Sequence, residues 1–155
     1  MGVGQGSALS PILSALYLSP FLYILEKYLK NLKIPISILS FIDDGLIIAQ
    51  NKSIDISNAH LFCSYNVFLK LLVDFSLVIK HRKTEIFYFN RLHGIFKPPP
   101  LDLTLLSSLS LHPKDTWKYL GFFFDCKLTF YQHINHYSNK AMSMVKCMKL
   151  LRNSS

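Results

Sequence analysis

Two adjacent acidic residues, Asp43 and Asp44, are the side chains of this sequence best suited to chemistry. They lie between two short apolar runs, and Gly45 follows them. β-Branched runs on both sides of an Asp-Gly step predict a β-hairpin over about residues 36–49, with its turn at or near these three residues. Neighbouring carboxylates repel each other unless a cation lies between them, and Mg²⁺ binds carboxylate oxygens while keeping waters for a phosphate-bearing substrate. A solvated turn is the alternative interpretation of this stretch taken alone.

A glycine-rich loop over residues 2–7 precedes a long helical pattern. Its three glycines let backbone N–H groups approach a ligand closely, as loops that cradle phosphates do, although no Gly-Lys-Ser/Thr step of a Walker loop follows. Ser10 and Pro11 are typical of the N-cap and the first position of a helix. The spacing of the apolar residues predicts that this helix continues to about Leu32, and Pro20 is expected to kink or interrupt it.

The rest of the chain is predicted to form two more helices and three more strands. Amphipathic spacing indicates helices over about residues 55–75, capped by Ser53 or Asp55, and over about residues 130–151. Runs rich in β-formers predict strands over residues 77–79, 84–89 and 117–125, with a turn at 81–82 and an irregular loop over 90–116.

The charge balance indicates a polyanionic partner. The 155 residues, one domain or a piece of one, contain 17 Lys and Arg against 9 Asp and Glu, which gives a net charge of +8. Such an excess suggests nucleic acid or an anionic membrane surface.

Zinc is not expected. The three cysteines, Cys63, Cys126 and Cys147, are too scattered for a zinc site and are interpreted as buried or incidental thiols in a reducing compartment, the nucleus or the cytoplasm. His133 and His136 have i, i+3 spacing, but no acidic or cysteine partner lies near them in the sequence.

A membrane anchor over residues 8–32 is a minor alternative. The first 25 residues carry no charge, which is long enough to span a bilayer, and lysines follow at 27, 30 and 33. Polar and small residues before residue 11 and the two prolines, Pro11 and Pro20, argue against a span, and a signal peptide would need a positively charged start. Membrane association is therefore not favoured.

Four stretches together resemble the palm of a reverse transcriptase. In chain order they are Gly4-Gln5-Gly6-Ser7-Ala8-Leu9-Ser10-Pro11, Phe41-Ile42-Asp43-Asp44, Lys83-Thr84-Glu85 and Tyr119-Leu120-Gly121-Phe122. Their residue patterns are most similar to those of non-LTR retrotransposon enzymes, especially fungal copies. The resemblance implies an α+β fold, a partial palm with a small antiparallel sheet and helices on one face over residues 1–126, and the start of the thumb over residues 127–155.

The resemblance also implies roles for single residues. Asp43 and Asp44 match the aspartates that bind Mg²⁺ or Mn²⁺, and Lys83 matches a lysine near the incoming triphosphate. The other matches are Gln5, Gly6 and Ser7 in the loop lining the nucleotide pocket, Leu120 and Gly121 in the primer grip, and Lys140, Lys146 and Lys149 on a thumb helix that follows the duplex phosphates.

The implied parent activity is RNA-directed DNA polymerisation by a two-metal mechanism, with an RNA template, a DNA primer and deoxynucleoside triphosphates as partners. In this family a further aspartate lies on a strand before the glycine-rich loop, and this sequence begins at the loop. We therefore expect a fragment that is inactive alone and whose remaining partner is the rest of the same polymerase. A non-catalytic nucleic-acid-binding remnant is the alternative.

Overall fold

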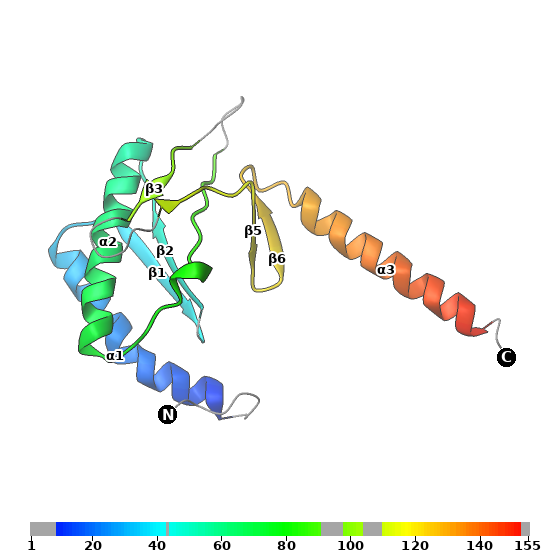
Figure 1. Cartoon of the computed structure of the whole chain (residues 1–155), viewed down its shortest axis with the longest axis horizontal. Helices are drawn as coiled ribbons and strands as arrows, with labels where there is room; N and C mark the ends of the chain where they lie inside the picture. The colour runs from blue at the N-terminus through cyan, green and yellow to red at the C-terminus, as the bar shows by residue number, and fades with distance from the viewer. Residues whose placement is uncertain (1–8, 43, 91–97, 104–109, 153–155) are drawn as a thin grey trace. The chain divides into compact units, whose positions relative to one another are not determined.

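The computed structural model describes residues 9–42, 44–90, 98–103 and 110–152. The chain divides into two compact units, residues 1–84 with 101–110 and residues 85–100 with 111–155. In order, the elements are α1 (Ser10–Asn31), β1 (Ile36–Phe41), β2 (Asp44–Ala49), α2 (Ile54–Asp74), the 3-10 helix η1 (His81–Lys83), β3 (Leu101–Asp102), β4 (Ser110–Leu111), β5 (Thr116–Tyr119), β6 (Phe122–Asp125) and α3 (Tyr131–Arg152). The predicted α+β fold class is confirmed (Figure 1). Within the described residues, however, the strands form separate two-stranded sheets, not one small sheet.

The first unit is built on the predicted hairpin. Strands β1 and β2 pair antiparallel, with Ile36 opposite Ala49 and Phe41 opposite Asp44. Because side chains alternate along a strand, Ile36 and Ile38 share the face that packs on the helices. Helices α1 and α2 lie against this hairpin in Figure 1, and their bounds agree with the predicted helices within two residues.

The core of this unit joins the two helices. Phe21, Leu25 and Leu29 are spaced along one face of α1 and are almost completely buried against Leu71 and Leu72 of α2. Leu25 has no exposed surface at all. The ring of Phe21 also meets those of Phe68 and Phe75 edge-on, with centroids 5.4 and 5.5 Å apart. Apolar burial of this kind is the main stabilising term of a small unit.

Helix α1 differs from the prediction at Pro20. The helix continues through this residue without interruption, and its N-cap is Leu9 where Ser10 was expected. Helix α1 is also long and apolar enough to cross a membrane by length and composition. The same test is passed by core helices, which are mostly buried. Helix α1 supplies the three buried residues described above, but only 17% of its apolar window is buried.

Two predicted strands are not formed. Residues 77–79 and 84–89 have no regular secondary structure. Leu77 and Ile79 pack on the core while Val78 is 92% exposed, so burial alternates along this apolar run although no strand forms. The backbone N–H of Leu77 bonds to the carbonyl of Leu72 at the end of α2, 2.8 Å away, instead of to a neighbouring strand.

The second unit contains a hairpin where one strand was predicted. Strands β5 and β6 pair antiparallel, and Leu120 and Gly121 connect them. The aromatic residues form a stack, in which Trp117 lies 6.1 Å from Phe87, 4.9 Å from Tyr119 and 5.5 Å from Phe124, measured between ring centroids. Helix α3 agrees with the predicted last helix, but its apolar stripe is exposed, not buried.

Candidate functional site

The acidic hairpin turns one residue earlier than the sequence suggested. Phe41 and Asp44 form the last backbone pair, so Ile42 and Asp43 make the connection and Asp44 and Gly45 already belong to β2. Asp43 lies outside the described residues. Ile42 has a φ of 58°, a left-handed conformation that is strained for a β-branched residue. Such strain is concentrated at functional sites.

Asp44 stands at the end of an apolar face. Because paired residues project to the same side, Asp44 shares its face with Phe41, Leu39 and Ile48, which are 53%, 52% and 38% exposed. An exposed carboxylate is a suitable oxygen ligand for Mg²⁺. Among the described residues, however, no three His, Cys, Asp or Glu side chains gather as a metal site. The donor chemistry fits a divalent ion, and the small number of donors predicts weak binding.

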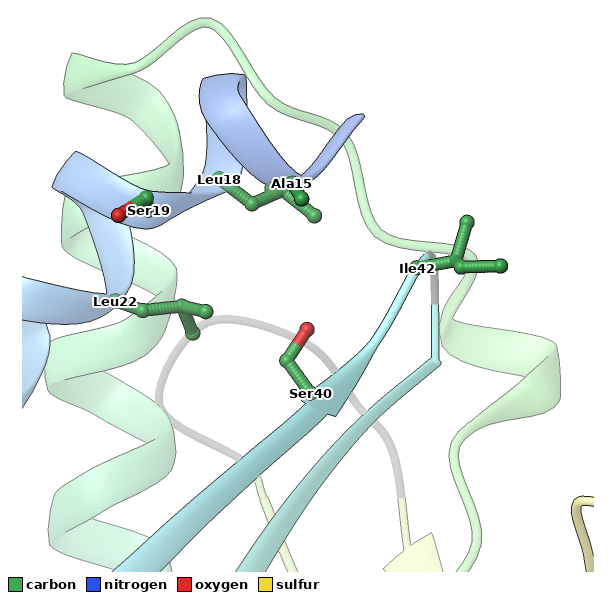
Figure 2. Close-up of a pocket in the computed structure, with 6 residues that line it drawn as sticks. All are labelled: Ala15, Leu18, Ser19, Leu22, Ser40 and Ile42. Atoms are coloured by element: carbon green, nitrogen blue, oxygen red, sulfur yellow. The ribbon is translucent and has the colours of Figure 1, made fainter. Parts of the chain in front are cut away.

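A small cavity lies beside the hairpin tip (Figure 2). Its volume is about 200 Å³, and its lining comes from α1 and the end of β1: Ala15, Leu18, Ser19, Leu22, Ser40 and Ile42. The Ser40 side chain points into the space between the hairpin and α1 in Figure 2. The lining residues carry no charge, so this cavity does not suit a phosphate or a metal ion.

Lys83 is the last residue of η1 and is exposed to solvent. Figures 1 and 2 both show this short helix beside the tip of the acidic hairpin. Tyr65 of α2 contacts the first residue of this short helix, with its hydroxyl 2.9 Å from Nδ1 of His81. Burial raises the pKa of Tyr65, and a hydrogen bond with the side chain of Thr84 lowers it in part. The sequence analysis missed this anchor.

Glu85, the third residue of the Lys-Thr-Glu stretch, forms an ion pair with Lys114 within the second unit. The only other ion pair among the described residues joins Glu26 and Lys30 on α1. Lys83 therefore has no acidic partner in the described part of the chain.

Leu120 and Gly121 form the turn between β5 and β6. Both have positive φ, 48° and 86°, as a two-residue hairpin connection of the primed type requires. Helix α3 holds this turn, because the hydroxyl of Tyr137 donates a hydrogen bond of 3.1 Å to the carbonyl of Gly121. The predicted primer-grip residues are thus tied to the first turns of the last helix.

The two histidines of α3 contact aromatic rings. His133 stacks on Phe122 with centroids 5.0 Å apart, and His136 lies 4.8 Å from Phe123. The backbone N–H of Phe123 donates to Nδ1 of His133 over 3.4 Å. These contacts give both residues a role in packing the hairpin against α3.

Asp125 closes the loop between β6 and α3. Its carboxylate accepts backbone N–H bonds from Lys127, Thr129 and Phe130, at 3.2, 3.1 and 2.8 Å. Burial alone would raise the pKa of this carboxyl, but the hydrogen bonds from the backbone of Thr129, Phe130 and Lys127 and from the Thr129 side chain together hold it below its ordinary value. Asp125 is a structural cap.

The three lysines proposed to bind nucleic acid are exposed along α3. Lys146 and Lys149 are three residues apart and share a face, whereas Lys140 precedes Lys149 by nine residues and lies on the opposite side of the helix. Cys63 and Cys147 are exposed and Cys126 is partly buried, so of the two predicted alternatives, buried or incidental thiols, burial does not apply to the first two. Gln5, Gly6 and Ser7 lie outside the described residues, as Asp43 does.

Comparison with known proteins places most of these residues in one family. The family model described as reverse transcriptase (RNA-dependent DNA polymerase) matches residues 1–124, four fifths of the chain. This range includes the glycine-rich loop, the acidic hairpin, Lys83 and the β5–β6 turn, and it ends before α3. No curated protein and no solved structure matches the chain significantly.

Proposed function

The chain belongs to the reverse transcriptase family, and from this premise we propose that it forms part of the catalytic palm of an RNA-directed DNA polymerase. The proposal assigns residues 1–126 to the palm and residues 127–155 to the start of the thumb. The residue patterns of the Gly4–Pro11 and Lys83–Glu85 stretches support a non-LTR retrotransposon of fungal type as the source. The partners are then an RNA template, a DNA primer and deoxynucleoside triphosphates.

The acidic hairpin is the centre of this proposal. Family members generally use divalent metal ions. Asp43 and Asp44 would hold Mg²⁺ or Mn²⁺, which when bound supplies neutralisation of phosphate charge and activation of a primer hydroxyl. The hairpin supports this role, because Asp44 is exposed and begins β2 directly after the connection.

The remaining residues would bind and orient the substrates. Gln5, Gly6 and Ser7 would line the nucleotide pocket, and the Lys83 ammonium would stabilise the charge that develops on the departing pyrophosphate. Leu120 and Gly121 would position the primer end, and Lys140, Lys146 and Lys149 would contact the phosphates of the duplex.

One observation carries the proposal: the strained Ile42 sits at the tip of a hairpin whose next two residues are the acidic pair, within the range that the family model matches. The test is hydrogen exchange of the hairpin amides with and without Mn²⁺. Because the described residues offer few ligands, we expect protection only at millimolar concentrations of the ion, as in weak sites.

Replacing both acids, Asp43→Asn and Asp44→Asn, should abolish the Mn²⁺-dependent protection. The matched control is Asp74→Asn, which removes an exposed carboxylate of the same unit at the end of α2 and should leave the protection intact. Identical titrations of the parent chain and the double variant would refute the metal site.

A further inference from the structure

Helix α3 carries an apolar stripe along one side. Its members alternate at spacings of three and four residues, which places them on one face of a helix. They are Ile134, Tyr137, Ala141, Met144, Met148 and Leu151. Every residue of α3 from Ile134 to Leu151 is exposed. Neighbouring exposed apolar side chains with polar residues around them are typical of an interaction surface.

The β5–β6 hairpin holds α3 near the start of the helix. His133 stacks on Phe122, and the hydroxyl of Tyr137 donates its hydrogen bond to the carbonyl of Gly121. Farther along the helix, the side chains of the stripe are more exposed than Tyr137, which is 42% exposed. Met144 is 57% exposed and Met148 is 67% exposed. The helix is therefore fixed at one end and presents its apolar side along the rest of its length.

The charges around the stripe are all positive. The sequence has no Asp or Glu between Tyr131 and Arg152. At about 100° per residue, Lys140 and Lys149 lie about 90° to either side of the midline of the stripe. Both lysines are exposed. A lysine stem can lie along apolar surface while its ammonium reaches a polar layer, so the stripe has a cationic border on each side.

This arrangement suits a partner that is negatively charged and touches the helix from one side only. The side of α3 opposite the stripe is mostly polar and includes Gln132, Asn135, Asn139, Ser143 and Lys146. A second copy of the chain is less suitable, because a helix without acids offers no ion pair to an identical helix. The stripe from Ala141 to Leu151 also spans fewer than two heptads, whereas a coiled coil typically needs three or four.

We propose that α3 lies along an anionic membrane surface, with the apolar stripe in the interface and with Lys140 and Lys149 binding lipid headgroups on either side. Of the described helices, only α1 is long and apolar enough to cross a membrane, so α3 lies on the surface and does not span. This association is distinct from an anchor over residues 8–32. It also goes beyond the proposed function, because it uses a different side of α3 from the one that carries Lys146.

The first test is flotation of the 155-residue chain with two kinds of vesicle. One kind is phosphatidylcholine alone, and the other contains about 30% phosphatidylserine. We expect binding to the anionic vesicles to be at least about tenfold tighter, since each lysine near an anionic surface contributes about fivefold. Lys140→Ala should weaken it by about fivefold, and Lys52→Ala, which removes an exposed lysine outside α3, should not. Equal binding to both kinds of vesicle would overturn the proposal.

Two matched double variants test the stripe. Met144→Ala with Met148→Ala should weaken binding to the anionic vesicles by about tenfold or more, because apolar burial drives insertion into the interface. The control is Met142→Ala with Leu150→Ala. These two residues are 60% and 70% exposed, and they lie on the opposite side of the helix. Alanine preserves helix content, which circular dichroism checks.

The control double variant should bind the vesicles as the parent chain does. Equal weakening by both doubles would indicate a partner that encloses the helix, and unchanged binding in both would place the membrane contact outside α3. Either result would overturn the proposal.

Two parallel measurements address the other partners. Calcium-loaded calmodulin offers an acidic protein with a Met-rich groove. Binding to it without binding to the vesicles would assign the stripe to a protein and overturn the lipid surface. Sedimentation velocity without vesicles should show a chain whose association state is the same in both double variants. A dimer that dissociates only in the Met144 and Met148 variant would assign the stripe to a second copy.

Discussion

The three lysines of α3 do not form one binding face, and this geometry makes a sharp prediction. Helix α3 is unbroken from Tyr131 to Arg152. At about 100° per residue, Lys149 lies about 60° around the axis from Lys146, while Lys140 lies about 120° from Lys146 and about 180° from Lys149. A duplex on one side of the helix can therefore contact Lys146 and Lys149 together, and Lys140 only weakly or not at all.

The perturbation is the double variant Lys146→Ala and Lys149→Ala, compared with Lys140→Ala. Each phosphate neutralised contributes about 0.9 to the slope of log K against log salt on B-form DNA. Two lost contacts should therefore make the slope on an RNA–DNA hybrid shallower by roughly 1.5 to 2, whereas Lys140→Ala should leave it nearly unchanged. Fluorescence anisotropy of a labelled hybrid between about 50 and 200 mM salt measures both slopes.

Two results would refute this reasoning. A slope change in Lys140→Ala as large as that of the double variant would show that the duplex does not lie along the Lys146 side. If the slope of log K against log salt is the same in every variant as in the parent chain, the binding face lies away from α3. Circular dichroism is the control for helix content, which alanine should preserve because of its high helix propensity.

Two further predictions concern the cap and the activity. Asp125→Ala should lower the free energy of unfolding by about 1 kcal/mol at pH 7, as the loss of a cap does, while Asp115→Ala should not. The pKa of Asp125 is lower in the folded state, so its contribution to stability is complete above the unfolded pKa of about 4 and is lost as pH falls through the folded pKa. In urea unfolding, the difference in free energy of unfolding between parent and variant should therefore shrink in acid. A difference that stays constant with pH would contradict this. The 155-residue chain alone should not extend a primer on poly(rA)–oligo(dT) with Mg²⁺ or Mn²⁺, because two metals need more carboxylate ligands than Asp43 and Asp44 supply; extension that disappears in Asp43→Asn would show that another acid fills the site.

The elements that depend on local pattern were predictable from the sequence. The acidic hairpin follows from two β-branched runs around an Asp-Gly step, and α1, α2 and α3 follow from helical spacing. Residues 77–79 form a short apolar run rich in β-branched residues, which is typical of a strand, yet pairing depends on a neighbouring backbone that the pattern does not specify. The turn at Leu120 and Gly121 lies within a stretch that was predicted as one strand, because a leucine gives no sign in the sequence that its φ will be positive.

The residue types of the candidate site could be predicted from the sequence, but the tertiary contacts that hold those residues in place could not. Asp44 and Lys83 were identified from the sequence, and the structure places both on the surface of the first unit. The contact between Tyr65 and His81 spans 16 residues and forms only once α2 has packed. Asp125 likewise acts as a cap only because three backbone N–H groups of the following loop bind its carboxylate. Supports of this kind depend on tertiary contacts that no local spacing reports.

The distribution of charge connects the proposed phosphate sites. Of the 17 lysines and arginines, only Lys30 and Lys114 form ion pairs within the described residues. Most of the positive charge is therefore available to a polyanion, both at η1 and on α3. Charges on exposed side chains are screened over a Debye length of about 8 Å at physiological ionic strength. Both phosphate sites should consequently weaken with salt, and the dependence should be steeper for the duplex on α3, because more counterions are released from a nucleic acid than from one nucleoside triphosphate.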